Sequence, residues 1–367
     1  MGIQKLILNI ILNIEAFCLS MLKVKYNRIT FISLESNQLS LDFLLIYNAL
    51  DLTKYDVKLC LIKYKKNLWG QFLYFINCMK QLYYVRTSKV ILLHDNNYVV
   101  SHFKSKNVKV IQVWHACGAI KKFGNVIERK YPIQNYDYVL ATSTYWQDAY
   151  SQAFGVDRQS VLPYGLPRTD HLFDSHWIMS TKEKMYEKYP ELKNKKIILY
   201  APTFRGNIYK GFEAIDFDVK TLLGGLDEDY MVIYKFHPLM CEHHLDSDSR
   251  VICMNHEDTH ELFCISDYLI SDYSSIIFDY MILQKPILLY VPDYKDYCND
   301  LGVFVDINDL HYPICKSVED IQEVIKTDCF DKEVIETNKD IFFDYQDGKS
   351  TKRIIDFINS LLNSLHK

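Results

Sequence analysis

The chain has little excess charge of either sign, and this absence narrows the kinds of partner that it can have. Over 367 residues, 42 Lys and Arg side chains are balanced by 46 Asp and Glu, for a net charge of −4. A chain without a basic excess is not expected to bind nucleic acid over a large surface. With 49% hydrophobic and 24% charged residues, it is not a disordered chain either. We therefore expect a globular protein, long enough for two domains.

No cysteine pair or acidic pair points to a bound metal. The ten cysteines include no Cys-x-x-Cys spacing, and several of them, such as Cys60 and Cys264, lie in apolar runs, which is typical of reduced thiols in a cytosolic protein. Cys241 with His243 and His244 lacks the paired spacing of a zinc site. No Asp-x-Asp pair stands at a strand end expected to bind a nucleotide. We therefore expect no metal, no cofactor and no disulfide framework.

The chain also lacks an apolar run long enough to cross a bilayer. Residues 6–14 are apolar apart from Asn9 and Asn13, but Glu15 follows, and the run is shorter than the roughly 20 residues that a spanning helix needs. No small-residue cleavage site follows, so a signal peptide is not indicated. The run predicts an amphipathic helix, which either lies on a membrane surface or packs on the fold. Residues 65–84 mix Lys with Trp, Phe and Tyr, as suits an anionic membrane face or a packed helix with a solvated edge.

Short apolar runs alternate with segments of helical periodicity in two series. One series has runs at 28–35, 57–63, 89–94, 108–115 and 137–143, and the other has runs at 195–200, 230–236, 251–254, 268–270 and 286–291. Strands that alternate with helices form parallel sheets. The pattern predicts an α/β protein of two Rossmann-like lobes facing a cleft. We expect an N-terminal lobe over 1–175, a C-terminal lobe over 176–348, and a last helix over 349–367 that crosses back to the N-terminal lobe.

The junction at 270–280 has the pattern of a phosphate-binding turn. An apolar strand ends just before Asp272, and the hydroxyls of Ser274 and Ser275 stand where a helix begins. With Ser274 as N-cap, the free backbone N–H groups and the positive dipole end of the helix favour an anion. A plain N-cap that binds nothing is the alternative.

Three further clusters fall at strand ends, where α/β folds place ligands. His115 follows a strand and precedes Gly118, which permits a close backbone approach, so the imidazole is a candidate base. Thr203 and Arg205 offer a hydroxyl and a guanidinium suited to phosphate. Lys235 and His237 share one face of a strand that Pro238 ends. Taken singly, each cluster has an ordinary structural explanation. Three phosphate-capable clusters in one lobe, with a histidine in the other, predict a site for a nucleotide diphosphate.

Several motifs resemble those of the CDP-glycerol glycerophosphotransferases of teichoic-acid and capsule synthesis, which are enzymes of GT-B type. They follow the order of that family over residues of about 110 to 360. The motifs are Trp-His-x-x-Gly-x-x-Lys-Lys-x-Gly at 114–124, Gly-Leu-Pro-Arg-Thr-Asp at 165–170, Tyr-Ala-Pro-Thr-Phe-Arg at 200–205, Lys-Phe-His-Pro at 235–238, the run 271–280 with Lys285-Pro286 after it, and Asp-Gly-Lys-Ser at 347–350.

The resemblance implies transfer of glycerol phosphate, or a related polyol phosphate, from a CDP-linked donor to a hydroxyl of a lipid-linked or glycan acceptor, with release of CMP. A CDP-ribitol enzyme, a nucleotide-sugar glycosyltransferase and a non-catalytic membrane-surface partner protein are the alternatives. We also expect a cytoplasmic protein associated with the inner face of the cell membrane, and we leave open whether it forms a homo-oligomer.

The same resemblance assigns roles to single residues. His115 corresponds to the base that deprotonates the acceptor, and His237 to a group that contacts the donor diphosphate and the departing CMP. The residues assigned to bind phosphate oxygens are Thr203, Arg205, Lys235, Ser274 and Ser275. Asp272 is assigned to orient its loop. The residues assigned to the acceptor side are Trp114, Gly118, Lys121 and Lys122. Ala116 and Cys117 depart from the Gly-Thr that is usual after the histidine.

Overall fold

The computed structural model describes residues 3–129, 131–203, 205–207, 211–213, 215–236, 248–294 and 302–363. The chain divides into two compact units. Unit 1 comprises Met1–His115, Phe123–Asp170 and Lys349–Lys367, and unit 2 comprises Ala116–Lys122 and His171–Gly348. The short segment 116–122 thus groups with unit 2, although it lies within the expected N-terminal lobe over 1–175.

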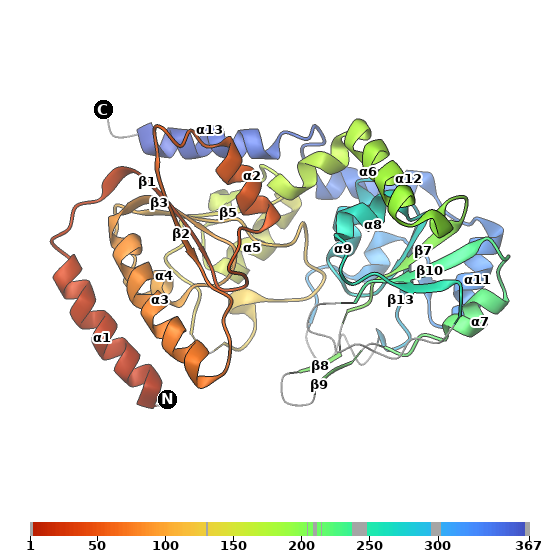
Figure 1. Cartoon of the computed structure of the whole chain (residues 1–367), viewed down its shortest axis with the longest axis horizontal. Coiled ribbons are helices and arrows are strands. Elements are labelled where there is room, and N and C mark those ends of the chain that lie inside the picture. The colour runs from red at the N-terminus through yellow and green to blue at the C-terminus, as the bar shows by residue number, and fades with distance from the viewer. Residues whose placement is uncertain are drawn as a thin grey trace. The chain divides into compact units, whose positions relative to one another are not determined.

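Unit 1 is a parallel sheet with the strand order β2-β1-β3-β4-β5-β6. Its strands are β1 (Lys25–Ser33), β2 (Asp56–Leu61), β3 (Ser88–Leu93), β4 (Lys109–Gln112), β5 (Tyr138–Leu140) and β6 (Val161–Leu162). Its helices are α1 (Ile3–Leu19), α2 (Leu41–Ala49), α3 (Leu68–Thr87), α4 (Tyr98–Phe103), α5 (Gln147–Phe154) and α13 (Ser350–Asn363) (Figure 1). β3 is buried along its whole length, as expected for a central strand whose two faces are covered.

The register of this sheet brings three strand ends together. Ile32 of β1 pairs with Leu93 of β3, and Leu93 pairs with Gln112 of β4. All three strands run in the same direction, so their carboxyl ends lie side by side at one edge of unit 1. Residues that follow these strands in the sequence are therefore brought close to one another.

The C-terminal helix α13 packs on α2 and β3 of the same unit (Figure 1). Its start is held by Asp170, whose carboxylate oxygens accept the backbone N–H groups of Ser350 at 2.7 Å and Thr351 at 2.8 Å. Farther along, the Tyr55 hydroxyl donates to Asn359 at 2.6 Å. An acidic side chain at a helix start satisfies free N–H groups and complements the helix dipole, so the last helix is anchored at two points.

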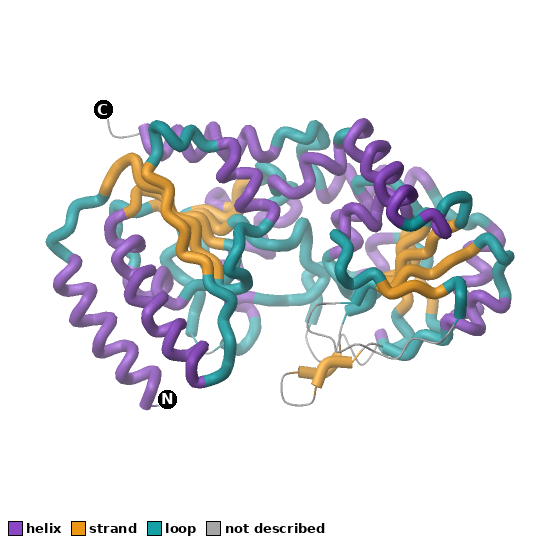
Figure 2. Tube along the Cα trace, viewed as in Figure 1, coloured by secondary structure: helices purple, strands orange, loops and turns teal. Residues whose placement is uncertain are grey.

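Unit 2 repeats this design with the strand order β11-β10-β7-β12-β13-β14. Its strands are β7 (Lys196–Tyr200), β10 (Tyr230–Tyr234), β11 (Val251–Cys253), β12 (Tyr268–Ser271), β13 (Ile287–Tyr290) and β14 (Ile314–Cys315), beside a two-stranded piece of β8 (Arg205–Asn207) and β9 (Gly211–Glu213). Its helices are α6 (Ser175–Lys188), α7 (Val219–Gly224), α8 (Thr259–Ile265), α9 (Ile276–Met281), α11 (Val318–Thr327) and α12 (Lys332–Phe342). Figure 2 shows strands flanked by helices in each unit. In the core, Tyr200 stacks on Phe217 with ring centroids 3.9 Å apart.

Short 3-10 helices complete the chain at η1 (Gly124–Val126), η2 (Thr144–Trp146), η3 (Arg158–Ser160), η4 (Pro167–Phe173), η5 (Pro190–Leu192) and η6 (Ile307–Leu310). The α/β class with two Rossmann-like units is confirmed, because both sheets are parallel throughout and alternate with helices. Within the described part of the chain, no helix combines the length and the apolar character needed to cross a membrane.

Candidate functional site

Three polar residues follow the adjacent strands β1, β3 and β4 of unit 1. Glu35 comes two residues after β1, His94 directly after β3, and His115 three residues after β4. The Glu35 carboxylate lies 3.2 Å from Nδ1 of His94 through one oxygen and 3.8 Å from Nδ1 of His115 through the other. The predicted strand over 108–115 is too long, because the strand ends at Gln112 and His115 stands in the loop beyond it.

The loop that carries His115 is held in an unusual conformation. Trp114 has a backbone φ of 57°, a left-handed value that is uncommon for a bulky residue and costs about 1–3 kcal/mol. Its indole stacks on Phe123 with ring centroids 4.8 Å apart and lies beside His115 at 3.9 Å. Packing of the indole thus fixes the direction in which the chain presents the imidazole.

Charged neighbours set the protonation of the two histidines. Burial alone would lower the pKa of His94, but hydrogen bonds and charge attraction from Asp42 and Glu35 outweigh it and raise this pKa to about 9. Burial lowers the pKa of His115 below its ordinary value, and the cations His94 and Arg168 act in the same direction, against the attraction of Glu35. At neutral pH, His94 is a cation and His115 is a neutral imidazole able to accept a proton.

In unit 2, Arg205 is held by two carboxylates. Nη1 donates to Asp272 at 2.8 Å, while Nε and Nη2 donate to the two oxygens of Asp293 at 2.7 and 3.2 Å. The other oxygen of Asp272 accepts the backbone N–H of Thr203 at 2.8 Å. Asp272 therefore joins the loop after β7 to the loop after β12. The direct contact of Arg205 with phosphate stays a prediction, since its guanidinium already binds Asp272 and Asp293.

The hydroxyl of Thr203 is one of the buried polar groups at this edge for which the described residues offer no hydrogen-bond partner. Thr203 is 8% exposed, and its Oγ1 has no hydrogen-bond partner among the described residues. A buried hydroxyl without a partner is costly to a fold. Its position beside Asp272 is consistent with the predicted role in binding phosphate.

The start of α9 is shifted by one residue from the expectation. The N-cap is Ser275, not Ser274, and α9 begins at Ile276. The Ser275 side chain makes no capping hydrogen bond, while Oγ of Ser274 accepts the N–H of Ile276 at 3.4 Å. The hydroxyl of Ser275 is thus not used to cap the helix.

The segment 116–122 supplies a lysine to the same unit. Backbone hydrogen bonds from Lys122 to Gly302 at 3.2 Å and from Phe304 to Ile120 at 2.7 Å hold it in place. Burial lowers the pKa of Lys121 to about 8; the Asp272 charge opposes this shift and the Arg205 charge supports it. Gly118, Lys121 and Lys122, for which the resemblance predicts the acceptor side, all group with unit 2, and their roles stay predictions.

The last predicted pair is described only in part. His237 lies outside the described residues. Lys235 donates through Nζ to the backbone carbonyl of Asn255 at 2.9 Å and to that of Glu257, and burial lowers its pKa. Its ammonium group therefore holds the segment after β11.

These arrangements can be compared with known proteins. Residues 14–360 match the family of the CDP-Glycerol:Poly(glycerophosphate) glycerophosphotransferases. The chain belongs to this family. The resemblance seen in its motifs is confirmed, and the protein is an enzyme of the glycerophosphotransferase type.

Two relatives and one solved structure illustrate the match. The chain is 35% identical over 370 residues to the teichoic acid ribitol-phosphate primase of Bacillus spizizenii, covering 94% of each chain. It is 32% identical over 361 residues to the teichoic acid poly(ribitol-phosphate) polymerase of that organism, covering 92% of this chain but 57% of the polymerase. A structure of the wall teichoic acid polymerase TagF, soaked with CDPG, superimposes with a TM-score of 0.75 at 23% identity, over 99% of this chain and 98% of that one. This last likeness supports the two-lobed fold of GT-B type.

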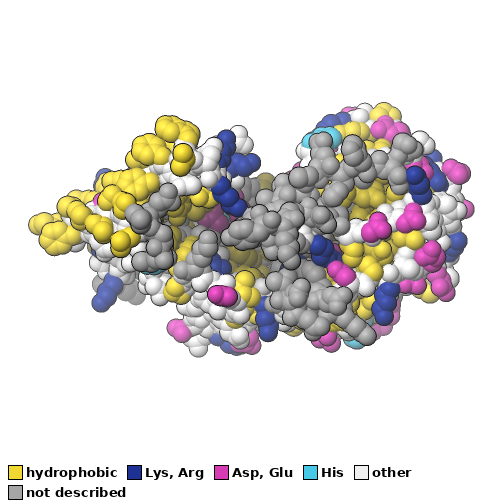
Figure 3. Space-filling view, turned by 90° about the horizontal axis from the view of Figure 1, so that it is seen from below, with side chains coloured by type: hydrophobic (Ala, Val, Ile, Leu, Met, Phe, Trp, Pro, Cys, Tyr) yellow, Lys and Arg dark blue, Asp and Glu magenta, His cyan; other side chains and the backbone are white. Residues whose placement is uncertain are grey.

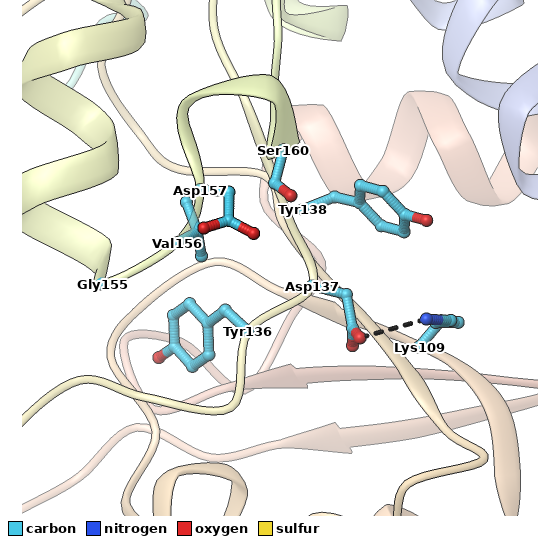
Figure 4. A pocket seen from close by; sticks show the side chains of 8 residues that line it. All are labelled: Lys109, Tyr136, Asp137, Tyr138, Gly155, Val156, Asp157 and Ser160. Atoms are coloured by element: carbon cyan, nitrogen blue, oxygen red, sulfur yellow. Dashed lines mark hydrogen bonds and ion pairs between the residues drawn. The ribbon is translucent and has the colours of Figure 1, made fainter.

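One hollow of unit 1 lies at the opposite edge of its sheet from Glu35, His94 and His115. It measures about 450 Å³ and opens at the amino ends of β4 and β5, between Lys109, Tyr138 and Asp157 (Figure 4). The Lys109 ammonium donates to Asp137 there at 3.3 Å. Ligands of open α/β sheets bind at the carboxyl ends of strands, so the candidate site is the opposite edge.

The sequence motifs did not indicate four residues of these clusters, namely Glu35, Asp42, His94 and Asp293. Glu35 and His94 are the last residues of two predicted apolar runs, 28–35 and 89–94, so the signal that singled out His115 was present in both. Asp293 lacked such a signal, because a carboxylate shortly after a strand is common. Its contact with Arg205 joins residues 88 positions apart.

The spacing of the unit 1 cluster also suits a cation. One donor atom each from Glu35, His94 and His115 lies within 4.8 Å of the others. A metal would require both imidazoles to be neutral, whereas His94 is held as a cation between carboxylates. In the absence of a metal, the same atoms form an ion-pair network.

Proposed function

We propose that the enzyme transfers a polyol phosphate from a CDP-linked polyol to a hydroxyl of a lipid-linked or glycan acceptor and releases CMP. The family match over residues 14–360 carries this proposal. The acceptor oxygen attacks the β-phosphorus, the bond from that phosphorus to the CMP oxygen breaks, and the acceptor proton passes to a base. Positioning and charge stabilisation supply most of such a reaction.

His115 is proposed as the base, because a lowered pKa keeps its imidazole neutral at neutral pH. The donor diphosphate is assigned to the edge of unit 2 where Thr203, Lys121 and Ser275 meet the loop of Asp272. Thr203 and Ser275 offer hydroxyls, Lys121 offers a cation, and the N–H groups at the start of α9 offer further donors. Arg205 is proposed to shape this loop, and His237 to contact the diphosphate, as the family resemblance implies.

Ribitol phosphate is proposed as the transferred unit. Relatives above 30% identity include four that are named for ribitol phosphate and one, at 31%, that is named for glycerol phosphate. Of the two Bacillus spizizenii relatives described above, the primase has the higher identity, 35% against 32% for the polymerase. We therefore propose a primase-like addition of one or a few units. The test is to offer CDP-ribitol, CDP-glycerol and a nucleotide sugar with a short lipid-disaccharide acceptor, then measure CMP release and product size. EDTA treatment in the same assay tests the expectation that no metal is required.

We also propose that unit 1 binds the inner face of the cell membrane. Large apolar side chains are exposed on α1 and α3, among them Phe17 at 80%, Leu68 at 82% and Trp69 at 65%. Figure 3 shows hydrophobic side chains gathered on the part of unit 1 at the left of the view. Lys65 and Lys66 are exposed just before α3. An apolar patch with adjacent cations suits an anionic lipid surface. Self-association stays a prediction.

A further inference from the structure

In unit 1, Asp42, His94 and Glu35 form a row of charged side chains that ends at His115. Asp42 lies 3.8 Å from Nε2 of His94, and Nδ1 of that ring lies 3.2 Å from Glu35. The other oxygen of Glu35 lies 3.8 Å from Nδ1 of His115. The order is therefore carboxylate, imidazolium, carboxylate and neutral imidazole. This arrangement goes beyond the residues that the sequence motifs assign.

Asp42 and His94, the two inner members of this row, are held by several contacts. Asp42 is 1% exposed and His94 is 6% exposed. Asp42 also accepts the backbone N–H of Arg168 at 2.9 Å, and the His94 ring packs edge-on against Phe43 at 5.4 Å. Buried charges cost free energy unless they are paired, so pairing fixes Asp42 and His94. The Glu35 side chain is 49% exposed and is held by its contact with His94.

The loop that carries Glu35 is fixed from the same side. Asp95, next to His94, accepts the hydroxyl of Ser33 at 2.8 Å and the backbone N–H of Leu34 at 2.6 Å. The backbone N–H of Glu35 then donates to the Ser33 hydroxyl at 3.2 Å. Asp95 and His94 together hold the backbone and the side chain of Glu35.

We propose that Glu35 positions His115 as the base of the reaction, and that His94, itself held by Asp42, keeps Glu35 in place. This proposal rests on the proposed function. In the proposed arrangement, Nδ1–H of His115 is directed at Glu35, whose carboxylate lies 3.8 Å away, so Nε2 keeps its lone pair for the acceptor proton. When the acceptor oxygen bonds to phosphorus, its proton passes to Nε2, and the imidazolium formed is stabilised by Glu35. The same logic orients the histidine of hydrolytic triads. The 3.8 Å separation leaves room for the contact to tighten when substrate binds.

Steady-state kinetics of three variants test this order of contacts. Glu35→Gln and His94→Gln are each expected to lower kcat by about 10- to 100-fold, part of the roughly 10² to 10⁴ that a general base contributes. KM for the CDP-polyol is expected to stay within about twofold, because both residues lie in unit 1 whereas the proposed donor site is in unit 2. The double variant is expected to lose no more than the more impaired single variant, since both residues act through one chain of contacts. Additive losses, or a change confined to KM, would overturn the proposal.

The pH dependence of kcat/KM distinguishes an effect of Glu35 and His94 on His115 from a general loss of packing. Glu35, His94 and Arg168 are the charged groups that face His115. Removal of the Glu35 charge is expected to move the acid limb of kcat/KM to lower pH, and removal of the His94 charge to move it to higher pH. Shifts in the same direction contradict the proposal. Glu128→Gln and His176→Gln, at exposed positions, are the matched controls and are expected to behave like the wild type.

A readout without substrate keeps this proposal apart from the proposed function. Nitrogen NMR of labelled histidine is expected to show the Nδ1–H tautomer at His115 in the wild type, and a loss of that preference in Glu35→Gln. If the wild type releases no CMP, the proposed function fails, while the tautomer still reports on Glu35. An unchanged tautomer overturns the positioning role. Tight binding of Zn²⁺ or Mn²⁺ that raises kcat and is lost in Glu35→Gln overturns it too, in favour of a metal site.

Discussion

The buried His94 predicts a stability that depends on pH in a defined direction. Its pKa of about 9 in the folded protein stands above the ordinary value of 6.5. At 1.36 kcal/mol for each pH unit, this difference corresponds to about 3 kcal/mol. Because the folded-state pKa is raised, the contribution is fully present below pH 6.5 and is lost as the pH rises through 9.

Other groups titrate in the same range, so the wild type alone does not isolate His94. Burial lowers the pKa of Lys121 and of Lys285 to about 8. A depressed lysine pKa destabilises the fold at neutral pH, and this penalty fades as the pH rises above 8. Both lysines lie in unit 2. They are common to the wild type and His94→Gln, so the difference between the two proteins removes their effect.

Tryptophan fluorescence during urea unfolding can follow unit 1 alone. Of the four tryptophans, only Trp177 lies in unit 2, so a Trp177→Phe background leaves Trp69, Trp114 and Trp146 as reporters of unit 1. In this background, the stability that His94→Gln removes is expected to shrink by about 3 kcal/mol between about pH 6 and pH 10. A difference that stays constant or grows with pH would refute the argument.

The remaining predictions concern the edge of unit 2 and the apolar patch. Asp272→Asn is expected to lower the free energy of unfolding by about 2–4 kcal/mol, because it leaves Arg205 with one carboxylate in a buried place. Calorimetry checks this. The control is Asp309→Asn at an exposed position, whose free energy of unfolding is expected to stay within about 0.5 kcal/mol of the wild type. Thr203→Val is expected to keep the fold, since its hydroxyl has no described partner, yet to raise KM for the CDP-polyol about tenfold; an unchanged KM removes Thr203 from the donor site. Trp69→Asp with Phe72→Asp is expected to abolish sedimentation with anionic vesicles, whereas Met179→Asp, 64% exposed on α6 in unit 2, should bind normally; equal binding by both would exclude the patch.

The inner strands of the sheets, such as β3, β10 and β13, could be predicted from the sequence because they are buried on both faces. The run predicted at 195–200 differs from β7 by one residue, since continuous apolar runs are what parallel strands require. The run at 108–115 was overestimated, because its residues are apolar enough for a strand but Trp114 takes a left-handed conformation that serves the loop. Burial decides where a strand can form, whereas the conformation at its end depends on partners such as Phe123.

The sequence indicated which types of side chain form the site, but not which of these side chains contact one another. A guanidinium at a strand end suits a phosphate and a carboxylate equally, so the sequence did not reveal that Arg205 binds Asp272 and Asp293. Glu35 and His94 could be found only by placing β1, β3 and β4 next to one another, which requires the order of strands in the sheet. Lys121 groups with unit 2 because the short segment 116–122 packs there, and the local pattern does not show this.

CMP release with the purified protein tests the central claim most directly. With CDP-ribitol and a short lipid-disaccharide acceptor, we expect CMP and polyol-phosphate product in equal amounts. His115→Ala is expected to lower the rate by about 10² to 10⁴ while the unfolding midpoint stays unchanged. No CMP from either CDP-polyol in the presence of acceptor, or turnover of a nucleotide sugar instead, would contradict the account.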